Sequence, residues 1–431
     1  MDSFESDSGL RRVVVTGMGA ITSLGRDVDT TWKALLEGRS GIRQIRQFPS
    51  DDFPVRIGSE VDLDGIELEG TEDLAPLMSR SVQFGIWALE QAWQDACLKD
   101  EAIDPWRSGV CIGAASFPIL EGDLARPEYI LHADHYHVEH YLELCRQMPE
   151  LLAQRDIGTV ATLLSMRHPL YGISTTVQTA CASATQAIGE AYHMIRHGEA
   201  DLLVSGGTDS MMSALPVIGF SLLGVTSFFQ GDPTKACRPF DRKRDGLVVG
   251  EGAGIVILEE LEHARRRGAR IHAEVIGYGS SCDGYRFTDS HPEGYGPISC
   301  MRAALEDAGI APEAVDYINA HGTATVQNDR TETTTIKRVF GDHAYRVPIS
   351  STKSQLGHLI CAAGGIELIV TVLAMNQGII PPTINLEHPD PACDLDYVPN
   401  RPRPARIRIA ISNSFGFGGQ NGTVVVRRWE E

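Results

Sequence analysis

The stretch Thr-Thr-Val-Gln-Thr-Ala-Cys-Ala-Ser-Ala-Thr-Gln-Ala-Ile-Gly at residues 175–189 decides the fold. A β-prone run ends at Thr179, and a helix-prone run of small residues starts just after Cys181. The pattern predicts a strand-to-helix junction with the sulfur near a helix N-terminus. Unpaired N–H groups and the helix dipole favour a thiolate there, so we expect a lowered thiol pKa and a cysteine nucleophile. A single cysteine is also typical of a buried structural residue, and this alternative stays open on this stretch alone.

Two later histidines stand in similar places. His321 follows a β-prone run at 315–319 and starts a loop of small residues, while His358 follows a run at 347–350 and opens an apolar helix. Each histidine alone is typical of a satisfied core or capping residue. A cysteine and two histidines that all stand at strand ends beside small residues predict a single catalytic site.

The order of elements repeats along the chain. Strands alternate with helices, which predicts an α/β fold with parallel sheets covered by helices. The repetition predicts two similar halves, whose strand ends converge on one crevice. We place the boundary near the basic stretch 262–270, which gives halves of 11–265 and 266–428. Each half is expected to contain a first strand, a helical segment, a strand-to-helix junction and a last strand that leads into a glycine-rich turn. In the first half these are 13–17, 31–38 with 83–97, the junction at Cys181 and 202–207. In the second half they are 272–277, 298–308, the junction at His358 and 406–419.

Composition excludes several classes of protein. The 431 residues are 42% hydrophobic and 22% charged, which is ordinary for a globular chain. A net charge of −19 argues against nucleic-acid binding. We find no apolar run that approaches a membrane span and no signal peptide in the first ten residues. The nine cysteines form no C-x-x-C pair, which predicts reduced thiols in the cytoplasm.

A set of ordered motifs carries a family resemblance. The chain resembles the β-ketoacyl-acyl-carrier-protein synthases of the thiolase-like superfamily, of the elongating Cys-His-His type, over about residues 11–428. The resemblance implies a five-layer α-β-α-β-α fold built from two duplicated halves. The motifs are Arg-Arg-Val-Val-Val-Thr-Gly-Met-Gly (11–19), Thr-Ala-Cys-Ala-Ser (179–183), Arg-Pro-Phe-Asp-Arg-Lys-Arg-Asp-Gly (238–246), Gly-Glu-Gly-Ala-Gly (250–254), His-Gly-Thr-Ala-Thr (321–325), Ser-Thr-Lys-Ser (351–354) and Asn-Ser-Phe-Gly-Phe-Gly-Gly-Gln-Asn (413–421).

The resemblance implies a decarboxylative Claisen condensation, in fatty-acid or in type II polyketide or polyene chain elongation. Cys181 then carries the acyl chain delivered by an acyl carrier protein, and His321 and His358 stabilise the enolate formed from a malonyl-loaded carrier. Lys353 and Glu332 pair with each other beside the histidines. The resemblance implies no cofactor, and it implies a homodimer or a heterodimer with a chain-length-factor-like subunit.

Aromatic residues near the C-terminus are assigned by the same resemblance. Phe417 lies over Cys181, and its backbone N–H completes an oxyanion hole. Phe415 stands on the same glycine-flexed turn, and Phe220 is a second aromatic lining the site. A plain aromatic plug in the core is the alternative for the two residues of the turn.

Three further positions bear on the substrate. The hydroxyls of Thr323 and Thr325 are expected to bond a pantetheine amide. Ser116 stands where fatty-acid elongators often have a bulky aliphatic residue, which implies a wider or more polar acyl pocket. The stretch 118–165 is also longer than in relatives, and this favours slightly a specialised polyketide or polyene pathway.

Two patterns resemble cofactor or metal sites. Gly17 and Gly19 after a strand resemble a dinucleotide fingerprint, but Thr22 stands at the third glycine, so we expect tight-turn glycines and no NAD. The His-rich stretch 132–140 is better read as a solvated or interface helix, and we predict no metal there.

A third pattern comes from the family. Glu367 with Ser412 and Asn413 matches positions where family members often hold a structural monovalent cation. Hydrogen bonds between buried polar groups of the core explain these residues equally well, and we predict no metal.

Several relatives and one non-enzymatic function are disfavoured. Thiolases carry a second cysteine in the C-terminal loop, which 413–421 lacks; chain-initiating and chalcone-type synthases have Asn in place of His358; chain-length factors lack the nucleophile that Cys181 provides. A catalytically silent scaffold or regulatory partner stays an alternative. The presence together of four site residues argues against it: Cys181, His321, Lys353 and His358.

Carrier docking needs a local basic patch, because the carrier is acidic and this chain carries −19. The first candidates are Arg238, Arg242, Lys243 and Arg244. The run 265–267 is the second choice, and ordinary solvated charge is the alternative for both.

Overall fold

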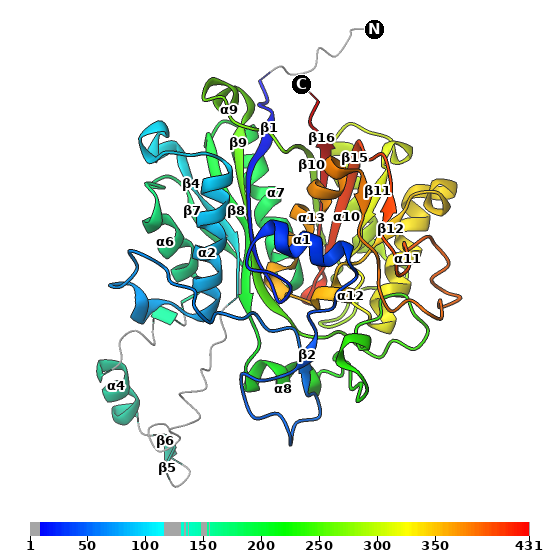
Figure 1. Ribbon diagram of the computed structural model, residues 1–431, viewed down its shortest axis with the longest axis horizontal. Coiled ribbons are helices and arrows are strands. Elements are labelled where there is room, and N and C mark those ends of the chain that lie inside the picture. The colour runs from blue at the N-terminus through cyan, green and yellow to red at the C-terminus, as the bar shows by residue number, and fades with distance from the viewer. Residues whose placement is uncertain are drawn as a thin grey trace.

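Two five-stranded sheets join edge to edge in the computed structural model, which describes residues 9–115, 131–132, 135–136, 138–147, 153–154 and 156–430 (Figure 1). The strand order across the joined sheet is β12-β11-β15-β16-β10-β1-β9-β8-β4-β7. The first half contributes β1 (Val13–Ile21), β4 (Ser108–Gly113), β7 (Ser174–Val177), β8 (Leu202–Ser210) and β9 (Glu251–Glu260). The second half contributes β10 (Ala273–Cys282), β11 (Tyr317–Asn319), β12 (Ile349–Ser350), β15 (Ile409–Phe415) and β16 (Gln420–Arg428).

The two halves have the same strand topology. In each, the strands follow one another along the chain in the same order and occupy matching places in their sheet. The halves meet where β1 pairs antiparallel with β10 over three residue pairs, from Val13 with Val275 to Val15 with Ala273. The predicted duplication is therefore confirmed.

Helices complete five layers. The middle layer holds α7 (Ser183–Arg196) and α13 (Ala363–Gln377), which contact strands of both sheets (Figure 1). The outer face of the first sheet is covered by α2 (Arg80–Asp95) and α6 (Gly158–Arg167). On the other side α10 (Tyr295–Asp307) packs on β10 and β16, with α11 (Val326–Phe340) beside it. The five-layer α-β-α-β-α arrangement is confirmed.

Shorter elements surround this framework. The helices are α1 (Val28–Leu36), α4 (Val138–Gln147), α8 (Ala214–Leu222), α9 (Leu261–Arg266) and α12 (Lys353–Leu356). The small strand pairs are β2 (Arg43–Gln44) with β3 (Ile57–Gly58), β5 (Leu131–His132) with β6 (His135–Tyr136), and β13 (Ile379–Ile380) with β14 (Arg403–Pro404). Ser116 lies outside the described residues, and so does most of 118–155, including part of the His-rich stretch.

The glycines of the dinucleotide-like motif have a packing role. Gly17 and Gly19 lie inside β1, under α2. A Cβ at Gly17 would lie 2.2 Å from the carbonyl oxygen of Ala92, and one at Gly19 would lie 1.9 Å from that of Ala88. The predicted tight turn is therefore wrong: the missing side chains let the backbone of α2 rest directly on the strand.

The middle helix also corrects an expectation about apolar length. Ile360–Gln377 is an 18-residue stretch with a mean hydropathy of 1.5, which is long and apolar enough for a membrane span. Of this stretch, 83% is buried inside the protein. Its apolar character is explained by its place between the two sheets, where both faces of α13 meet core residues.

Candidate active site

Cys181 stands between a strand and a middle-layer helix, as predicted. It belongs to the one-turn 3₁₀ helix η5 (Ala180–Ala182), which follows β7 and leads directly into α7. Ala180 has a φ of +49°, so the chain turns sharply just before the cysteine. The side chain is only 4% exposed.

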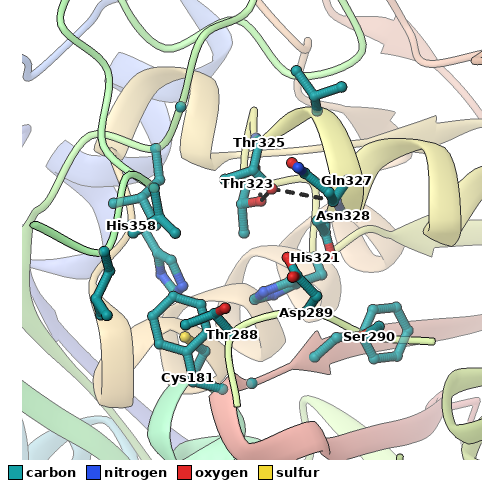
Figure 2. A pocket seen from close by; sticks show the side chains of 18 of the residues that line it. Cys181, Thr288, Asp289, Ser290, His321, Thr323, Thr325, Gln327, Asn328 and His358 are labelled. Atoms are coloured by element: carbon teal, nitrogen blue, oxygen red, sulfur yellow. Dashed lines mark hydrogen bonds between the residues drawn. The ribbon is translucent and has the colours of Figure 1, made fainter. Parts of the chain in front are cut away.

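The two histidines converge on this sulfur from the other half. His321 follows β11, and His358 lies between α12 and the one-turn helix η9 (Ile360–Ala362). The sulfur and one ring nitrogen of each histidine all lie within 4.8 Å of one another, and all three residues are buried. Figure 2 shows both rings directed toward Cys181. The meeting of these residues, predicted from their strand ends, is confirmed.

His358 is a neutral hydrogen-bond donor. The N–H of Ile360 donates to its Nδ1 at 3.1 Å, so the proton of the neutral ring sits on Nε2. Burial, with the Lys353 ammonium as a second cause, lowers the pKa of His358 well below its usual value. Nε2 is buried and has no hydrogen-bond partner within the described part of the chain. It is therefore available to a substrate oxygen.

The tautomer also bears on metal binding. Cys181, His321 and His358 have the residue types and spacing of a three-ligand metal site. A metal at Nε2 of His358 would need the ring proton on Nδ1, where it would meet the N–H of Ile360. The local geometry thus favours a donor over a ligand.

His321 is neutral for similar reasons. Burial, followed by the positive charge of Lys353, lowers the pKa of His321 well below its usual value. Its Nδ1 is buried without a partner among the described residues. Both imidazoles are therefore uncharged at neutral pH.

The thiol does not have the low pKa that its position predicts. Burial raises the pKa of Cys181 to about 11, although Lys353 and the N–H of Phe417 act in the opposite direction. The expected lowering is wrong, because removal from water outweighs the favourable dipoles. With a pKa of about 11, Cys181 is mainly a neutral thiol at neutral pH.

Phe417 stands close to the nucleophile on the glycine-rich turn. Its backbone N–H and that of Cys181 face the sulfur. A Cβ at Gly416 would lie 3.1 Å from the nitrogen of Cys181, so glycine permits this approach. The rings of Phe220 and Phe417 lie 6.4 Å apart, and that of Phe415 lies 5.8 Å from His321. All three aromatics line the cavities beside Cys181.

The predicted pairing of Lys353 with Glu332 is wrong. Lys353 forms its ion pair with Glu367 of α13, and both side chains are buried. Glu332 instead accepts hydrogen bonds from the N–H groups of His321 and Gly322, each at 2.8 Å. Burial raises the pKa of Glu332 to about 7. The lysine supplies charge to the site, and the glutamate fixes the loop of His321.

Glu367 also lies beside a group of buried oxygens. Its Oε2, Oδ1 of Asn319 and the hydroxyl of Ser412 have no partner among the described residues. Asn319 and Ser412 are paired in register, and Nδ2 of Asn319 donates to the carbonyl of Glu367 at 3.0 Å. Such a group of oxygens has the chemistry of a small-cation site. Such an ion would tie α13 to β11 and β15, and the absence of a metal stays a prediction.

Two cavities meet at Cys181. One of about 520 Å³ is lined by both histidines and by Thr323 and Thr325, whose hydroxyls lie 2.9 Å apart (Figure 2). The other, about 480 Å³, is lined mainly by apolar side chains that include Phe220 and Cys361. The arrangement suits a polar arm entering from one side and an apolar chain stored on the other.

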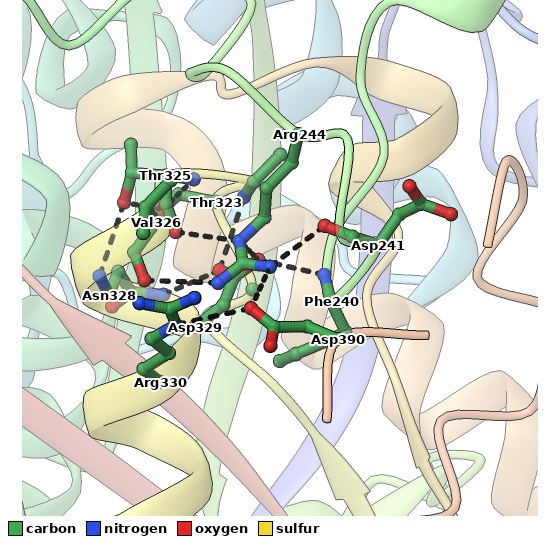
Figure 3. A network of polar contacts seen from close by, with 12 residues as sticks. Phe240, Asp241, Arg244, Thr323, Thr325, Val326, Asn328, Asp329, Arg330 and Asp390 are labelled. Atoms are coloured by element: carbon green, nitrogen blue, oxygen red, sulfur yellow. Dashed lines mark hydrogen bonds and ion pairs between the residues drawn. The ribbon is translucent and has the colours of Figure 1, made fainter. Parts of the chain in front are cut away.

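Arg244 is a structural residue, which corrects the expected docking patch. It is buried and forms ion pairs with Asp329 at 3.1 Å and Asp390 at 2.9 Å (Figure 3). It also donates to the carbonyls of Thr325 and Val326. Arg244 therefore anchors the loop that follows His321 and cannot receive a carrier.

The other basic candidates differ in position. Arg242 and Lys243 are exposed, and Arg238 is partly buried against Phe229. The run 265–267 lies at the far end of β9, a ten-residue strand about 30 Å long that starts beside His358. Figure 1 shows α9 near the two termini, while α8 is at the opposite end. The second choice is therefore far from the site.

Sequence reasoning missed two buried residues near Cys181. Asp209, at the end of β8, accepts a hydrogen bond from the N–H of Cys361 at 2.9 Å. Cys361 occupies in η9 the place that Cys181 has in η5. Alignment of the two halves would have revealed Cys361, because Ala-Cys-Ala (180–182) matches Ile-Cys-Ala (360–362).

Comparison with known families identifies the class of protein. The family described as "Beta-ketoacyl synthase, N-terminal domain" matches residues 10–264, and "Beta-ketoacyl synthase, C-terminal domain" matches residues 272–387. The chain belongs to the β-ketoacyl synthase family, whose members are acyltransferases.

Individual relatives cover nearly the whole chain. The 3-oxoacyl-[acyl-carrier-protein] synthase 2 of Coxiella burnetii is 42% identical over 97% of this chain and 99% of its own, and that of Synechocystis is 41% identical over the same shares. A β-ketoacyl synthase structure from Burkholderia phymatum has a TM-score of 0.86 at 36% identity, covering 98% of this chain and 100% of its own. A type II polyketide ketosynthase solved with its acyl-carrier protein has a TM-score of 0.84 at 34% identity, with the same coverage.

Proposed function

We propose that this chain is a β-ketoacyl-acyl-carrier-protein synthase that joins a cysteine-bound acyl chain to a malonyl unit with loss of CO2. The observation that carries the proposal is the buried group of Cys181, His321 and His358, with the N–H groups of Cys181 and Phe417 on the sulfur. A nucleophile, two neutral donors and an oxyanion hole are the parts that this chemistry needs.

The first half-reaction loads the enzyme. The sulfur of Cys181 attacks the thioester carbonyl of an acyl-loaded carrier, and the N–H groups of Cys181 and Phe417 hold the oxyanion. The bond from the carbonyl carbon to the carrier sulfur breaks, and the proton of Cys181 ends on the released carrier thiol. Because the thiol pKa is about 11, proton loss and attack are coupled rather than preceded by a stable thiolate.

The second half-reaction uses the histidines. A malonyl-loaded carrier enters with its thioester oxygen against the Nε2–H of His358 and the ring of His321. The bond to the carboxylate breaks, CO2 leaves, and the electron pair forms an enolate whose oxygen the two donors stabilise. The enolate carbon attacks the acyl-cysteine, the sulfur leaves, and one proton is taken up to restore the thiol. Burial, with the charge of Lys353 as a second cause, lowers the pKa of both imidazoles, so they stay neutral and stabilise the oxyanion by donating hydrogen bonds.

The polar cavity receives the pantetheine arm, with Thr323 and Thr325 as partners for its amides. The apolar cavity beside Phe220 stores the acyl chain, and Phe415 and Phe417 stand between the two. Ser116 is retained as a proposed wall residue of this pocket. Relatives at 41–42% identity carry a 3-oxoacyl-carrier synthase name, while one solved relative at 34% identity is titled as bound to a hexaketide. We therefore propose carbon-chain elongation and leave fatty-acid and polyketide chains as outcomes of the assay.

A dimer is part of the proposal. The edge strand β7 keeps part of its surface exposed, although its Val177 packs against the core that the two halves share. Open edges of this kind pair readily with a second strand. A solved ketosynthase with 35% identity is titled as a ketosynthase/chain length factor pair, which supports a sister subunit as well as a second copy. We place the enzyme in the cytoplasm, and sedimentation at micromolar concentration, alone and after co-expression with a candidate partner, tests the assembly.

The decisive experiment measures CO2 and acyl mass separately. The protein is mixed with acyl-loaded and malonyl-loaded carrier, and intact mass spectrometry follows the chain while released CO2 is counted. We expect acyl mass on Cys181 and CO2 in equal amount to β-ketoacyl product. Cys181→Gln should lose acylation and keep malonyl decarboxylation. A wild-type chain that takes no acyl mass and releases no CO2 would favour a silent scaffold instead.

Carrier docking is tested at the exposed charges. Arg242→Glu with Lys243→Glu should slow acylation from a carrier a few-fold, since rim charges mainly change association rates. A small thioester donor is the control, because it needs no docking surface. Equal loss with both donors would indicate a damaged fold, and no loss would place the docking surface elsewhere.

A further inference from the structure

The carboxylate of Asp209, in the first half, holds the turn that follows His358 in the second half. Asp209 lies near the end of β8 and is 1% exposed. Its Oδ2 accepts a hydrogen bond from the N–H of Cys361 at 2.9 Å, and its Oδ1 accepts one from the N–H of Ser210 at 2.8 Å. Cys361 belongs to η9, which begins two residues after His358. Asp209 therefore links the halves directly behind the site.

The neighbouring N–H group of the same turn faces the histidine. Ile360 donates to Nδ1 of His358 at 3.1 Å, and the next N–H, of Cys361, donates to Asp209. Two successive peptide groups share one turn and move together. The nitrogen that carries the imidazole proton is set by the hydrogen bond that the other nitrogen makes. The orientation of His358 thus depends on where the turn is held.

Backbone packing makes this support direct. A Cβ at Gly207 of β8 would lie 2.6 Å from the carbonyl oxygen of Cys361 and 2.6 Å from the Cβ of Ala184. The strand and η9 therefore touch through their backbones, with no side chain between them to absorb a shift. A displacement at the end of β8 would therefore move η9 directly.

We propose that Asp209 is a positioning residue for the condensation step. Its carboxylate holds the Ile360–Ala362 turn so that His358 presents Nε2–H to the thioester oxygen. The inference rests on the proposed function of His358. At the equivalent turn of the other half, the residue beside the N–H of Cys181 is Gly416, which has no side chain to accept a hydrogen bond.

The surroundings of Asp209 give its role a pH dependence. Burial raises the pKa of Asp209 to about 7, and Glu251 of β9 adds to the rise. The titratable groups around it are the thiols of Cys361 and Cys181 and the carboxylate of Glu251, which pairs with Arg80 of α2 at 2.6 Å. As the pH falls through about 7, Asp209 gains a proton and its hold on the Cys361 N–H weakens. The histidine-dependent step should therefore slow on the acid side.

Asp209→Asn tests the proposal with the two half-reactions measured apart. We expect malonyl-carrier decarboxylation to fall about 10- to 100-fold, as small misplacements of a catalytic group do. Acylation of Cys181 should not fall, because the Asp209 charge raises the pKa of the thiol and its removal acts in the opposite direction. The acid limb near pH 7 should disappear from the decarboxylation profile. Ser210→Ala is the matched control, because it removes the 2.7 Å contact with Glu251 and leaves the Asp209–Cys361 bond. It should keep both rates.

A double-mutant cycle separates positioning from a general structural role. In a His358→Ala background Asp209→Asn should cause no further loss, whereas in a His321→Ala background it should cause its full loss. Equal losses in both backgrounds, or equal loss of acylation and decarboxylation, would overturn the inference. If wild-type protein releases no CO2, the proposed function fails and this inference with it. If His358→Ala behaves as proposed and Asp209→Asn matches wild type, only the inference fails.

Discussion

The two one-turn helices that precede the middle layer have the same backbone and different chemical surroundings. Each begins at a residue with positive φ, +49° at Ala180 and +44° at Ile360, and each places a buried cysteine next. Each then leads directly into a middle helix. The duplicated fold thus provides two equivalent positions for a nucleophile.

Charge and hydrogen bonds distinguish these positions. Around Cys181, Lys353 and the N–H of Phe417 oppose the effect of burial on the thiol pKa. Around Cys361, burial raises the pKa well above its usual value and the Asp209 carboxylate adds to the rise. The comparison teaches that a sharp turn before a helix does not make a cysteine reactive. The groups that face the sulfur decide between the two halves.

The largest expected effect separates the two cysteines. Cys181→Ala should remove covalent acylation completely, because the attacking atom is lost, whereas Cys361→Ala should keep acylation within about threefold. Intact mass spectrometry after exposure to acyl-loaded carrier measures both. Acyl mass on the Cys181→Ala chain would mean that the second turn carries a nucleophile after all.

The histidines sharpen the contrast, since both approach the first turn from the second half. His321→Ala and His358→Ala should each lower decarboxylation of malonyl-carrier about 10²- to 10³-fold, which is typical for loss of one donor to a developing oxyanion. Acylation of Cys181 should persist in both. Normal CO2 release from either variant would remove that residue from the second half-reaction.

The pH dependence of alkylation tests the electrostatic difference. A thiol with a pKa of about 11 gains thiolate about tenfold per pH unit below that value, so alkylation at Cys181 should rise about 100-fold between pH 7 and pH 9. Cys361 should react more slowly at every pH. Peptide mapping after brief treatment with iodoacetamide gives both rates, and a small free thiol is the control, since it levels off near its own pKa. A plateau at Cys181 near pH 7 would show that the helix start outweighs burial.

The smallest effect concerns the glycines that pack against each turn. Gly416→Ala would place a Cβ 3.1 Å from the nitrogen of Cys181 and should slow acylation about tenfold by moving the oxyanion N–H groups. Gly207→Ala meets the second turn at 2.6 Å and should cost about 1–3 kcal/mol of stability through overpacking. Acylation rates and melting temperatures of the two variants check the assignment. Unchanged acylation by Gly416→Ala would mean that the first turn tolerates movement.

The residues that we propose as catalytic could be brought together from the sequence. Cys181, His321 and His358 each follow a β-prone run and precede small residues, and parallel strand ends converge by topology alone. The duplication followed from the repeated order of strands and helices, and the five layers were implied by the family resemblance. In these cases the local pattern and the tertiary structure agree.

The errors concern contacts and burial that only the tertiary structure reveals. Glu332 has the right charge for Lys353, but its oxygens are taken by the N–H groups of His321 and Gly322, and Glu367 reaches the lysine from the next helix. Gly17 and Gly19 looked like turn residues because the sequence does not reveal a helix backbone above a strand. The thiol pKa was misjudged because a helix start is visible in sequence and the depth of burial is not.

The position of β1 has a consequence for synthesis of the chain. β1 ends at Ile21, yet its main neighbour β9 begins only at Glu251. At about 5–20 residues per second, a ribosome needs on the order of 10 to 50 s to make the chain between them. During that time both edges of this apolar strand lack a partner, since β10 is made even later than β9. The first long helix able to cover its face is α2, which packs on Gly17 and Gly19. The long separation in sequence between β1 and β9 therefore also sets a period in which the nascent chain is exposed to aggregation and to chaperones.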